Sequence, residues 1–310
     1  MPIDTTSLPI IDAHHHYWDP VANYHPWLRD EPAIPFRYGD YSSIRKAFLP
    51  ADYKHLTKNF QIRATVTMEG EFDENNLVAE SAWMNQLASE QGAPAAHVAR
   101  AILQSPDASD IIHQHAAFPI VLGIRHKPAA ASTPDSIECG IAGSMSDPAW
   151  QRGYAALQPN GLHFELQAPW WHVTELMQLI EKFPDTPVVI NHAFMPVDRS
   201  PEALKSWRDA LSLASSAPGI TMKISGIGVS GKPWHLADQR PVIDACIDTF
   251  GPQRCMFASN FPVDGLVGSF DDIYGGFLDA TVDLDQADRT AMFHDNVIRI
   301  YRLDIRQLNT

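Results

Sequence analysis

The feature that most constrains the fold of this chain is a repeated alternation of short, apolar, β-branched runs with longer stretches of helical pattern. Such alternation favours parallel βα units over sandwiches and helix bundles, because parallel strands need a crossover between them. The short runs occupy 9–14, 62–68, 95–102, 120–125, 161–166, 187–191, 221–225 and 255–258. Eight strands with mostly helical crossovers predict the α/β class and a closed (β/α)8 barrel.

Helical patterns lie between most of these runs, at 74–91, 107–116, 147–157, 172–183, 201–217 and 236–250. The helix expected at 201–217 starts favourably, since Ser200 precedes Pro201 and Glu202. The rival fold, a doubly wound open sheet, normally has a glycine-rich turn after its first strand. This chain instead continues with three consecutive histidines, His14 to His16, so the barrel is the better prediction.

Length and loop composition bear on domain organisation. The 310 residues, 45% of them hydrophobic, can bury a large core. Length alone suggests about two domains, but an α/β barrel reaches this size as one, so we expect a single barrel over 1–310. The segment 20–50 is rich in proline and aromatic residues and long for one βα loop, which makes it a candidate lid over the active-site mouth. The segment 289–303 has a helical pattern and is expected to close the barrel bottom.

Charge and cysteine content exclude several function classes. The 23 basic and 37 acidic residues give a net charge of −14, a field that argues against nucleic acid or an anionic membrane as a partner. The longest apolar runs fall far short of the roughly 20 residues of a membrane span, and residues 1–9 lack a secretory-signal pattern. The scattered Cys139, Cys246 and Cys255 suit free thiols in a reducing compartment. We therefore expect a cytoplasmic protein.

Strand alternation predicts which side chains reach the barrel lumen, where the carboxyl ends of the strands carry the chemistry. The expected lumen-facing polar residues are Asp12, His14, His16, Thr65, Thr67, Glu69, Arg125, His163, Glu165, Gln167, Lys223 and Ser225. The sixth and eighth strands end at Asn191-His192 and Ser259-Asn260. Such a rim is costly unless its groups pair, bind a metal or meet a substrate. The alternative is a salt-bridged or water-filled mouth without chemistry.

Three histidines stand out in this set. His14 and His16 lie two residues apart at the end of the first strand, and His192 ends another strand across the barrel. Imidazoles at this spacing project from one face and can meet one divalent ion, with the third histidine completing a catalytic zinc-type site. The spacing and its place at the strand ends together favour a metal site.

At several strand ends the chain resembles the amidohydrolase superfamily, specifically its amidohydrolase-2 branch of barrel hydrolases, which includes sugar-lactone and muconolactone-type lactonases. The matching segments are IDAHHHYWD at 11–19, GIR at 123–125, GLHFELQ at 161–167, VVINH at 188–192, MKISG at 222–226 and MFASNFP at 256–262. They extend over nearly the whole barrel. The first and last are the most specific.

The resemblance implies a metal site, or its metal-free remnant, at His14, His16 and His192, with zinc expected and manganese possible. The aspartate that the family carries after the eighth strand falls on Asn260, and an amide cannot accept a proton from water near neutral pH. Asp264 could replace that base, or Glu69 could bind metal or act as the base. Altered chemistry, including a metal-free hydrolase, is the alternative.

The remaining inward residues are candidates for binding the substrate. Arg125 suits a substrate carboxylate because a guanidinium binds such a group with two hydrogen bonds, although an ion pair with Glu165 is the structural alternative. Lys223 could neutralise an oxyanion or serve a buried ion pair, and His163 could donate to an intermediate or only bond Gln167. Trp18 is expected in the pocket wall, and Gln167 at the rim.

These observations and the resemblance together predict an enzyme that hydrolyses the lactone ring of a small carboxylated or sugar-derived substrate. The alternatives are a decarboxylase or amide hydrolase of the same superfamily, since this scaffold hosts several chemistries, and an inactive barrel that binds a carboxylated ligand. Enzymes of this kind are often dimers, so a homodimer is a further expectation.

Overall fold

The computed structural model describes residues 8–304 and contains a sheet of eight parallel strands in chain order. The strands are β1 (Ile10–His15), β2 (Ile62–Met68), β3 (Ala96–Arg100), β4 (Val121–His126), β5 (His163–Leu166), β6 (Val188–Ile190), β7 (Ile220–Ile224) and β8 (Cys255–Phe257). Every strand pairs in parallel with the next. Beyond the end of β8, the backbone N–H of Asn260 donates to His14 O at 2.7 Å, which brings β8 beside β1. The predicted barrel is therefore confirmed as a nearly closed one.

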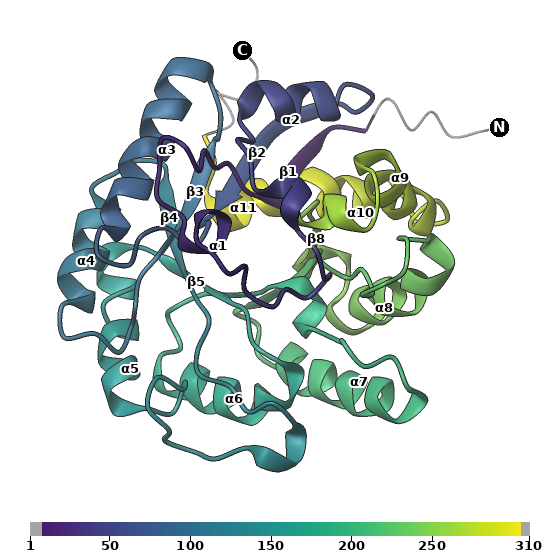
Figure 1. Ribbon diagram of the computed structural model, residues 1–310. Helices are drawn as coiled ribbons and strands as arrows, with labels where there is room; N and C mark the ends of the chain where they lie inside the picture. Colours follow the sequence, from purple (N-terminus) through teal and green to yellow (C-terminus); the bar gives the residue numbers. More distant parts are fainter. Residues whose placement is uncertain (1–7, 305–310) are drawn as a thin grey trace.

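Helices surround the strands, as Figure 1 shows in a view along the barrel. They are α1 (Pro26–Arg29), α2 (Pro50–Leu56), α3 (Leu77–Gln91), α4 (Ala108–Ala116), α5 (Pro148–Tyr154), α6 (Val173–Lys182), α7 (Pro201–Ser215), α8 (Leu236–Phe250), α9 (Phe270–Ala280), α10 (Gln286–Thr290) and α11 (Asn296–Tyr301). Helix α7 begins as its sequence predicts, because the Ser200 side chain accepts from the Ala203 N–H at 3.3 Å and Pro201 opens the helix. Helix α8 has the expected bounds, and the other expected helices are slightly shorter.

The barrel lumen corrects the predicted orientation of two strands. Its apolar cluster contains Ile11, Ala13, Val66 and Met68, so β2 turns its apolar residues inward and its threonines, Thr65 and Thr67, outward. The sequence could not reveal this, because both faces of a barrel strand are buried and alternation does not say which one is the lumen.

Strand β1 is corrected for a second reason. Its pairing with β2 shifts register between Asp12 and His15, and such an irregularity changes the face to which later side chains point. Asp12 therefore lies on the outer side. There it accepts hydrogen bonds from Ser259 Oγ at 2.5 Å, Tyr53 Oη at 2.8 Å and Tyr274 Oη at 3.2 Å.

The C-terminal helix closes the barrel end opposite the site, as its pattern predicts. Tyr301 of α11 is fully buried and belongs to the lumen cluster with Val297 and Leu303. Figure 1 shows α11 behind the ring of strands. This end of the barrel is a packed plug rather than an opening.

The segment 20–50 lies at the other end. It begins beside Trp18, which pairs with Phe48 in an antiparallel bridge, so both ends of the segment are tied together. Its aromatic residues pack with Trp18 and Val263 in a cluster of their own. Figure 1 shows the segment, in dark purple, crossing in front of the barrel.

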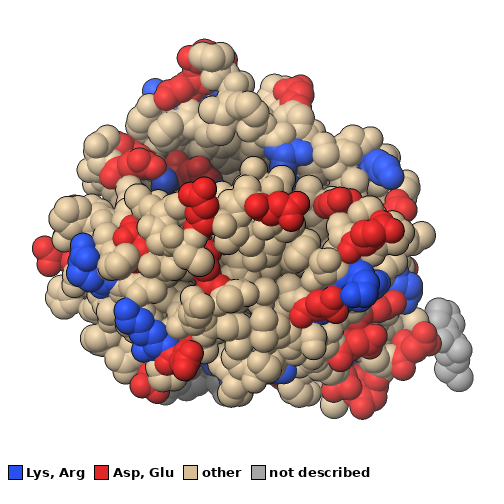
Figure 2. Space-filling model, turned by 90° about the horizontal axis from the view of Figure 1, so that it is seen from below, with Lys and Arg blue, Asp and Glu red and all other residues tan. Residues whose placement is uncertain are grey.

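The surface carries the net negative charge of the chain. Acidic side chains are scattered over the face in Figure 2, which is also hollowed near its top. Within residues 8–304, no helix is both long and apolar enough to cross a membrane.

Candidate active site

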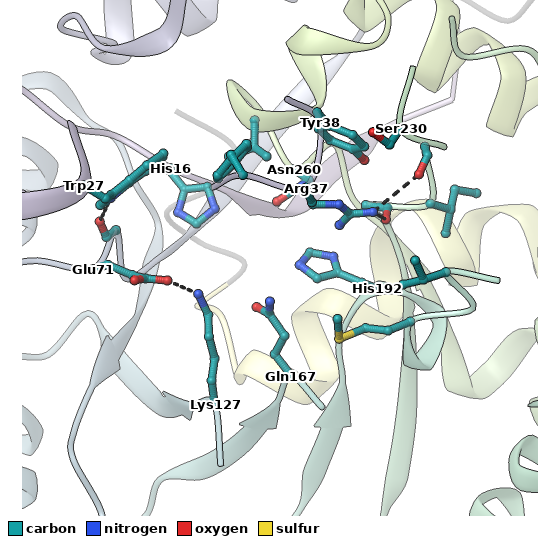
Figure 3. Close-up of a pocket in the computed structure, with 18 of the residues that line it drawn as sticks. His16, Trp27, Arg37, Tyr38, Glu71, Lys127, Gln167, His192, Ser230 and Asn260 are labelled. Atoms are coloured by element: carbon teal, nitrogen blue, oxygen red, sulfur yellow. Dashed lines mark hydrogen bonds and ion pairs between the residues drawn. The ribbon is translucent and has the colours of Figure 1, made fainter. Parts of the chain in front are cut away.

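A cavity of about 370 Å³ lies between the strand ends and the segment 20–50. Its inner wall includes His16, Glu69, Arg125, His192 and Asn260, which follow or end strands of the barrel. Its outer wall comes from the segment 20–50 and from the loops after β6 and β7. Figure 3 shows His16, Gln167, His192 and Asn260 around the space that these elements enclose.

The three predicted histidines meet at this end of the barrel. The ring centroid of His14 lies 5.2 Å from that of His16 and 4.8 Å from that of His192. Their side chains are almost wholly buried. Because His192, Ala193, Phe194 and Met195 all have positive φ angles, the chain turns sharply after β6 and brings His192 back over the strand ends.

Hydrogen bonds orient each imidazole. His16 Nδ1 donates to Met68 O at 3.1 Å, which leaves its Nε2 without a proton in the neutral ring. His14 Nδ1 lies 3.0 Å from Asn191 Oδ1, and this oxygen is the acceptor because the Asn191 amide nitrogen donates to Leu166 O. His192 Nδ1 bonds Ser225 Oγ at 2.9 Å. The Nε2 atoms are therefore the ones left for chemistry.

Burial keeps these histidines neutral. Desolvation lowers the pKa of His14 well below its ordinary value, and the charge of Lys223 adds to the effect. Desolvation also lowers the pKa of His16 and of His192, supported by Arg125 and Arg37 respectively. The site thus presents neutral imidazoles, which can accept hydrogen bonds from water.

Arg125 is paired with Glu69 on the wall of the cavity. Arg125 Nε and Nη2 lie 2.7 and 2.6 Å from Glu69 Oε1, and Nη2 also donates to Glu69 O at 2.8 Å. Burial alone would raise the pKa of Glu69, but Arg125 and other nearby cations lower it to about 2. A carboxylate held this firmly is a poor proton acceptor near neutral pH, which disfavours Glu69 as the base.

One nitrogen of Arg125 stays free of the carboxylate. Its Nη1 lies 3.3 Å from Gln167 Oε1 and 3.4 Å from His14 Nε2. Gln167 and Arg125 both line the cavity, so this end of the guanidinium faces the space where a substrate would lie. The alternative that Arg125 pairs with Glu165 is wrong.

Glu165 instead has Lys223 as its partner, deeper in the lumen. Lys223 Nζ lies 2.8 Å from Glu165 Oε2, and both side chains are fully buried. His163 Nε2 is 3.2 Å from the same carboxylate, and the Tyr301 hydroxyl donates to it. Neither His163 nor Lys223 lines the cavity. Both were candidates for binding substrate, and the structure places them one layer below it; Lys223 forms the buried ion pair that was its alternative role.

Asn260 and Asp264 lie side by side at the end of β8. Asn260 Nδ2 donates to Asp264 Oδ1 at 2.6 Å, and the Tyr38 hydroxyl donates to the same oxygen at 3.1 Å. Asn260 and Tyr38 line the cavity, whereas Asp264 lies directly behind them. Burial raises the pKa of Asp264 to about 6, against the opposing effects of Arg37 and these hydrogen bonds. A carboxyl group with such a pKa is well matched to proton transfer near neutral pH.

Trp18 is part of the cavity wall. Its ring stacks on His16 with centroids 5.7 Å apart, and its indole nitrogen donates to Lys46 O at 2.9 Å. It therefore holds the segment 20–50 against the first strand as well as shaping the pocket.

The residues as arranged do not fit a divalent ion. The lone pair of His14 Nε2 faces the Arg125 guanidinium, so a cation bound there would meet a fixed positive charge. Asn260 offers an amide where a carboxylate would bind. Among residues 8–304, no group of three histidine, cysteine or acidic side chains is placed to hold a metal ion.

Several site residues escaped the sequence analysis. Arg37, Tyr38 and Arg199 line the cavity from loops, and loop conformations cannot be derived from residue pattern. The only available signal was the aromatic-rich composition of the segment 20–50, which predicted a lid without naming the residues that reach the site.

Comparison with known proteins identifies the family. The family model described as Amidohydrolase matches residues 11–303, and the chain therefore belongs to the amidohydrolase family. The family includes decarboxylases as well as hydrolases, and its members usually depend on a metal ion.

Three relatives illustrate the similarity. A Sinorhizobium fredii protein named y4mH is 35% identical over 96% of this chain and 100% of its own length. An L-fucono-1,5-lactonase of Burkholderia multivorans is 26% identical over 94% and 96% of the two chains. A crystal structure of a Burkholderia multivorans amidohydrolase with bound zinc superposes with a TM-score of 0.76 at 23% identity, covering 95% of this chain and 99% of that one.

Proposed function

We propose that this protein hydrolyses a lactone, opening the ring of a small carboxylated or sugar-derived substrate. The observation that carries the proposal is the Asp264 carboxyl, with its raised pKa, in contact through Tyr38 and Asn260 with a cavity that also exposes Arg125. Lactone hydrolysis needs groups that polarise the carbonyl, hold the attacking water and accept its proton. The residues of this cavity can perform these three functions. The L-fucono-1,5-lactonase relative agrees with this reading.

Arg125 polarises the carbonyl in this proposal. Its Nη1 atom donates to the carbonyl oxygen and stabilises the negative charge that develops there during attack. Glu69 fixes the guanidinium through Nε and Nη2, so little reorganisation is needed. Arg125 therefore acts on the reacting group, a role different from the carboxylate anchor first expected.

The imidazoles of His16 and His192 and the Asn260 amide oxygen position the attacking water. Because Asn260 Nδ2 is used by Asp264, its Oδ1 is the atom left to accept a hydrogen bond from water. The Tyr38 oxygen accepts the proton of the water while the Tyr38 hydroxyl proton passes to Asp264. The resulting hydroxide oxygen forms the new bond to the carbonyl carbon.

Ring opening reverses the proton movement. The tetrahedral intermediate collapses, the bond between the carbonyl carbon and the ring oxygen breaks, and the leaving alkoxide takes a proton from Asp264 by the same route. The product is a hydroxy acid, and Asp264 is again ionised. No step of this proposed mechanism uses a metal ion.

The zinc ion expected at His14, His16 and His192, with manganese as the second candidate, is not part of this proposal, because the residues as arranged do not fit a divalent ion. Elemental mass spectrometry on protein purified without chelator tests it. About one ion per chain, with activity lost on chelation, would support a metal-activated water in place of the Tyr38 route.

A panel of lactones, amides and aromatic carboxylates tests the proposed activity. Hydrolysis of at least one lactone, followed by acid release at constant pH, is the expected result. Release of carbon dioxide would favour the decarboxylase alternative, and amide cleavage would favour the amide hydrolase. Ligand binding without turnover of any compound would identify an inactive barrel.

A further inference from the structure

More cationic than anionic side chains line the cavity. Arg37, Arg125, Lys127 and Arg199 all line it. Arg125 and Lys127 each have a glutamate partner in the wall. The ion pairs found within residues 8–304 include neither Arg37 nor Arg199. A cation-rich cavity in a chain of net charge −14 attracts anions to one place.

The two unpaired arginines approach the same loop from different elements. Arg37 Nη2 donates to Gly226 O at 2.7 Å and to Gly228 O at 3.4 Å, and Arg199 Nη2 donates to Ile227 O at 2.8 Å. Three consecutive carbonyls thus hold two like charges near each other. Figure 3 shows Arg37 between Tyr38 and His192, so Arg37 borders the reacting centre.

Arg199 has donors left over. Its Nε and Nη1 atoms are buried and have no hydrogen-bond partner, and such groups are rare because each costs free energy. Burial lowers the pKa of Arg199, and the neighbouring Arg37 also acts in that direction. An anion bound in the cavity beside Arg37 and Arg199 would relieve the repulsion between the two guanidinium groups.

We infer that Arg37 and Arg199 form a subsite for a second anionic group of the substrate, a carboxylate or a phosphate. The inference rests on the proposed lactone hydrolysis and names the substrate class: a lactone that carries an acid group in addition to the ring. Arg125 polarises the ring carbonyl, while the arginine pair holds the acid group.

The remaining cavity wall favours a substrate with few hydroxyl groups. Much of it is apolar, with Trp27, Phe36, Met195, Ile227 and Val263 among the lining residues. Each sugar hydroxyl buried against such a wall would need a hydrogen-bond partner. A compact, acidic lactone therefore fits better than a neutral sugar lactone.

Matched pairs of lactones test the subsite. The γ-lactone of α-hydroxyglutarate carries a carboxylate where γ-valerolactone carries a methyl group, and gluconolactone can be compared with and without a terminal phosphate. We expect a kcat/KM at least about 10-fold higher for the anionic member of the favoured pair, as a charged hydrogen bond provides. A preference within the first pair would identify a carboxylate site, and a preference within the second pair would identify a phosphate site.

Three variants locate the effect. Arg37→Gln and Arg199→Gln are each expected to raise KM for the anionic lactone at least about 10-fold and to leave KM for the neutral lactone nearly unchanged. Because Arg37 also lowers the pKa of Asp264, the assays are run well above pH 6, where the carboxylate of Asp264 stays ionised in the variant. Arg208→Gln, an exposed position on α7, is the control for net charge. If Arg199→Gln fails to fold, Arg37→Gln at an exposed position of the segment 20–50 still gives the test.

The outcomes separate this inference from the proposed function. Hydrolysis of both members of every pair at equal rates would overturn the subsite and leave the lactonase intact. Equal losses for neutral and anionic lactones in the arginine variants would also overturn it. Absence of hydrolysis with all four lactones would contradict the proposed function itself.

Discussion

At the scale of single residues, the exchange of a carboxylate for an amide at position 260 changes how the site can handle protons. Asn260 cannot serve as a base, but its amide nitrogen supports Asp264 at 2.6 Å. The carboxyl group of Asp264 therefore lies farther from the cavity than a carboxyl group at position 260 would, because Asn260 and Tyr38 stand between Asp264 and the cavity. The amide holds a neighbouring acid in place of acting itself.

Restoring the acid at this position makes a test at the same scale. Asn260→Asp would put two carboxyl groups within hydrogen-bond distance, where the repulsion of like charges raises one of the two pKa values. We expect the acidic limb of kcat/KM to move upward by at least about one pH unit, with lower activity at neutral pH. If kcat/KM of the variant rises with pH over the same range as in the wild type, Asp264 does not control this pH dependence.

At the scale of elements, sequence pattern was sufficient for the strands and most helices and insufficient for the loops. Periodicity placed β2 correctly, yet it assigned Val66 and Met68 to the wrong face because both faces are apolar or small. His14, His16 and His192 could be grouped from their positions at strand ends. Arg37 and Arg199 could not, since their approach depends on the path of loops that no local rule fixes.

Helix α5 packs closely against the backbone that follows β3, and this contact can be tested. A Cβ atom added at Gly153 would lie 2.1 Å from Leu103 O, a backbone atom that cannot move aside. Gly153→Ala is therefore expected to lower the free energy of unfolding by about 1–3 kcal/mol and to lower Tm. In α9, nothing lies within 4 Å of the corresponding atom at Gly275, so Gly275→Ala should leave Tm unchanged or raise it. Equal effects of both substitutions in thermal unfolding would contradict this packing.

At the scale of the whole molecule, the two ends of the barrel have separate tasks. Helix α11 seals one end through Tyr301 and the buried Glu165–Lys223 pair, while the segment 20–50 covers the cavity at the other. The Glu165–Lys223 pair therefore lies below the site and does not contact the substrate. The expected homodimer stays a prediction, which sedimentation would test.

The separation of the two ends predicts that a substitution at the sealed end lowers stability without changing activity. Tyr301→Phe removes one hydrogen bond to Glu165, whose other partners, Lys223 and His163, remain. Loss of a bond to a buried charged group is expected to cost about 1.5–3 kcal/mol in unfolding free energy, measured by denaturant titration. Because Tyr301 does not line the cavity, kcat/KM should change little. A large loss of kcat/KM in the folded variant would show that the two ends are coupled.

The pH dependence of lactone hydrolysis in wild type and Asp264→Asn tests the central claim most directly. Burial raises the pKa of Asp264 to about 6, and a base must be ionised to act, so kcat/KM of the wild type should rise with pH through that value and level off above it. Asp264→Asn should lose at least about 10²-fold and lack this limb. A folded Asp264→Asn variant that keeps the wild-type rate and the same rise of kcat/KM with pH would contradict the account. The role of proton acceptor would then fall to His16 or His192.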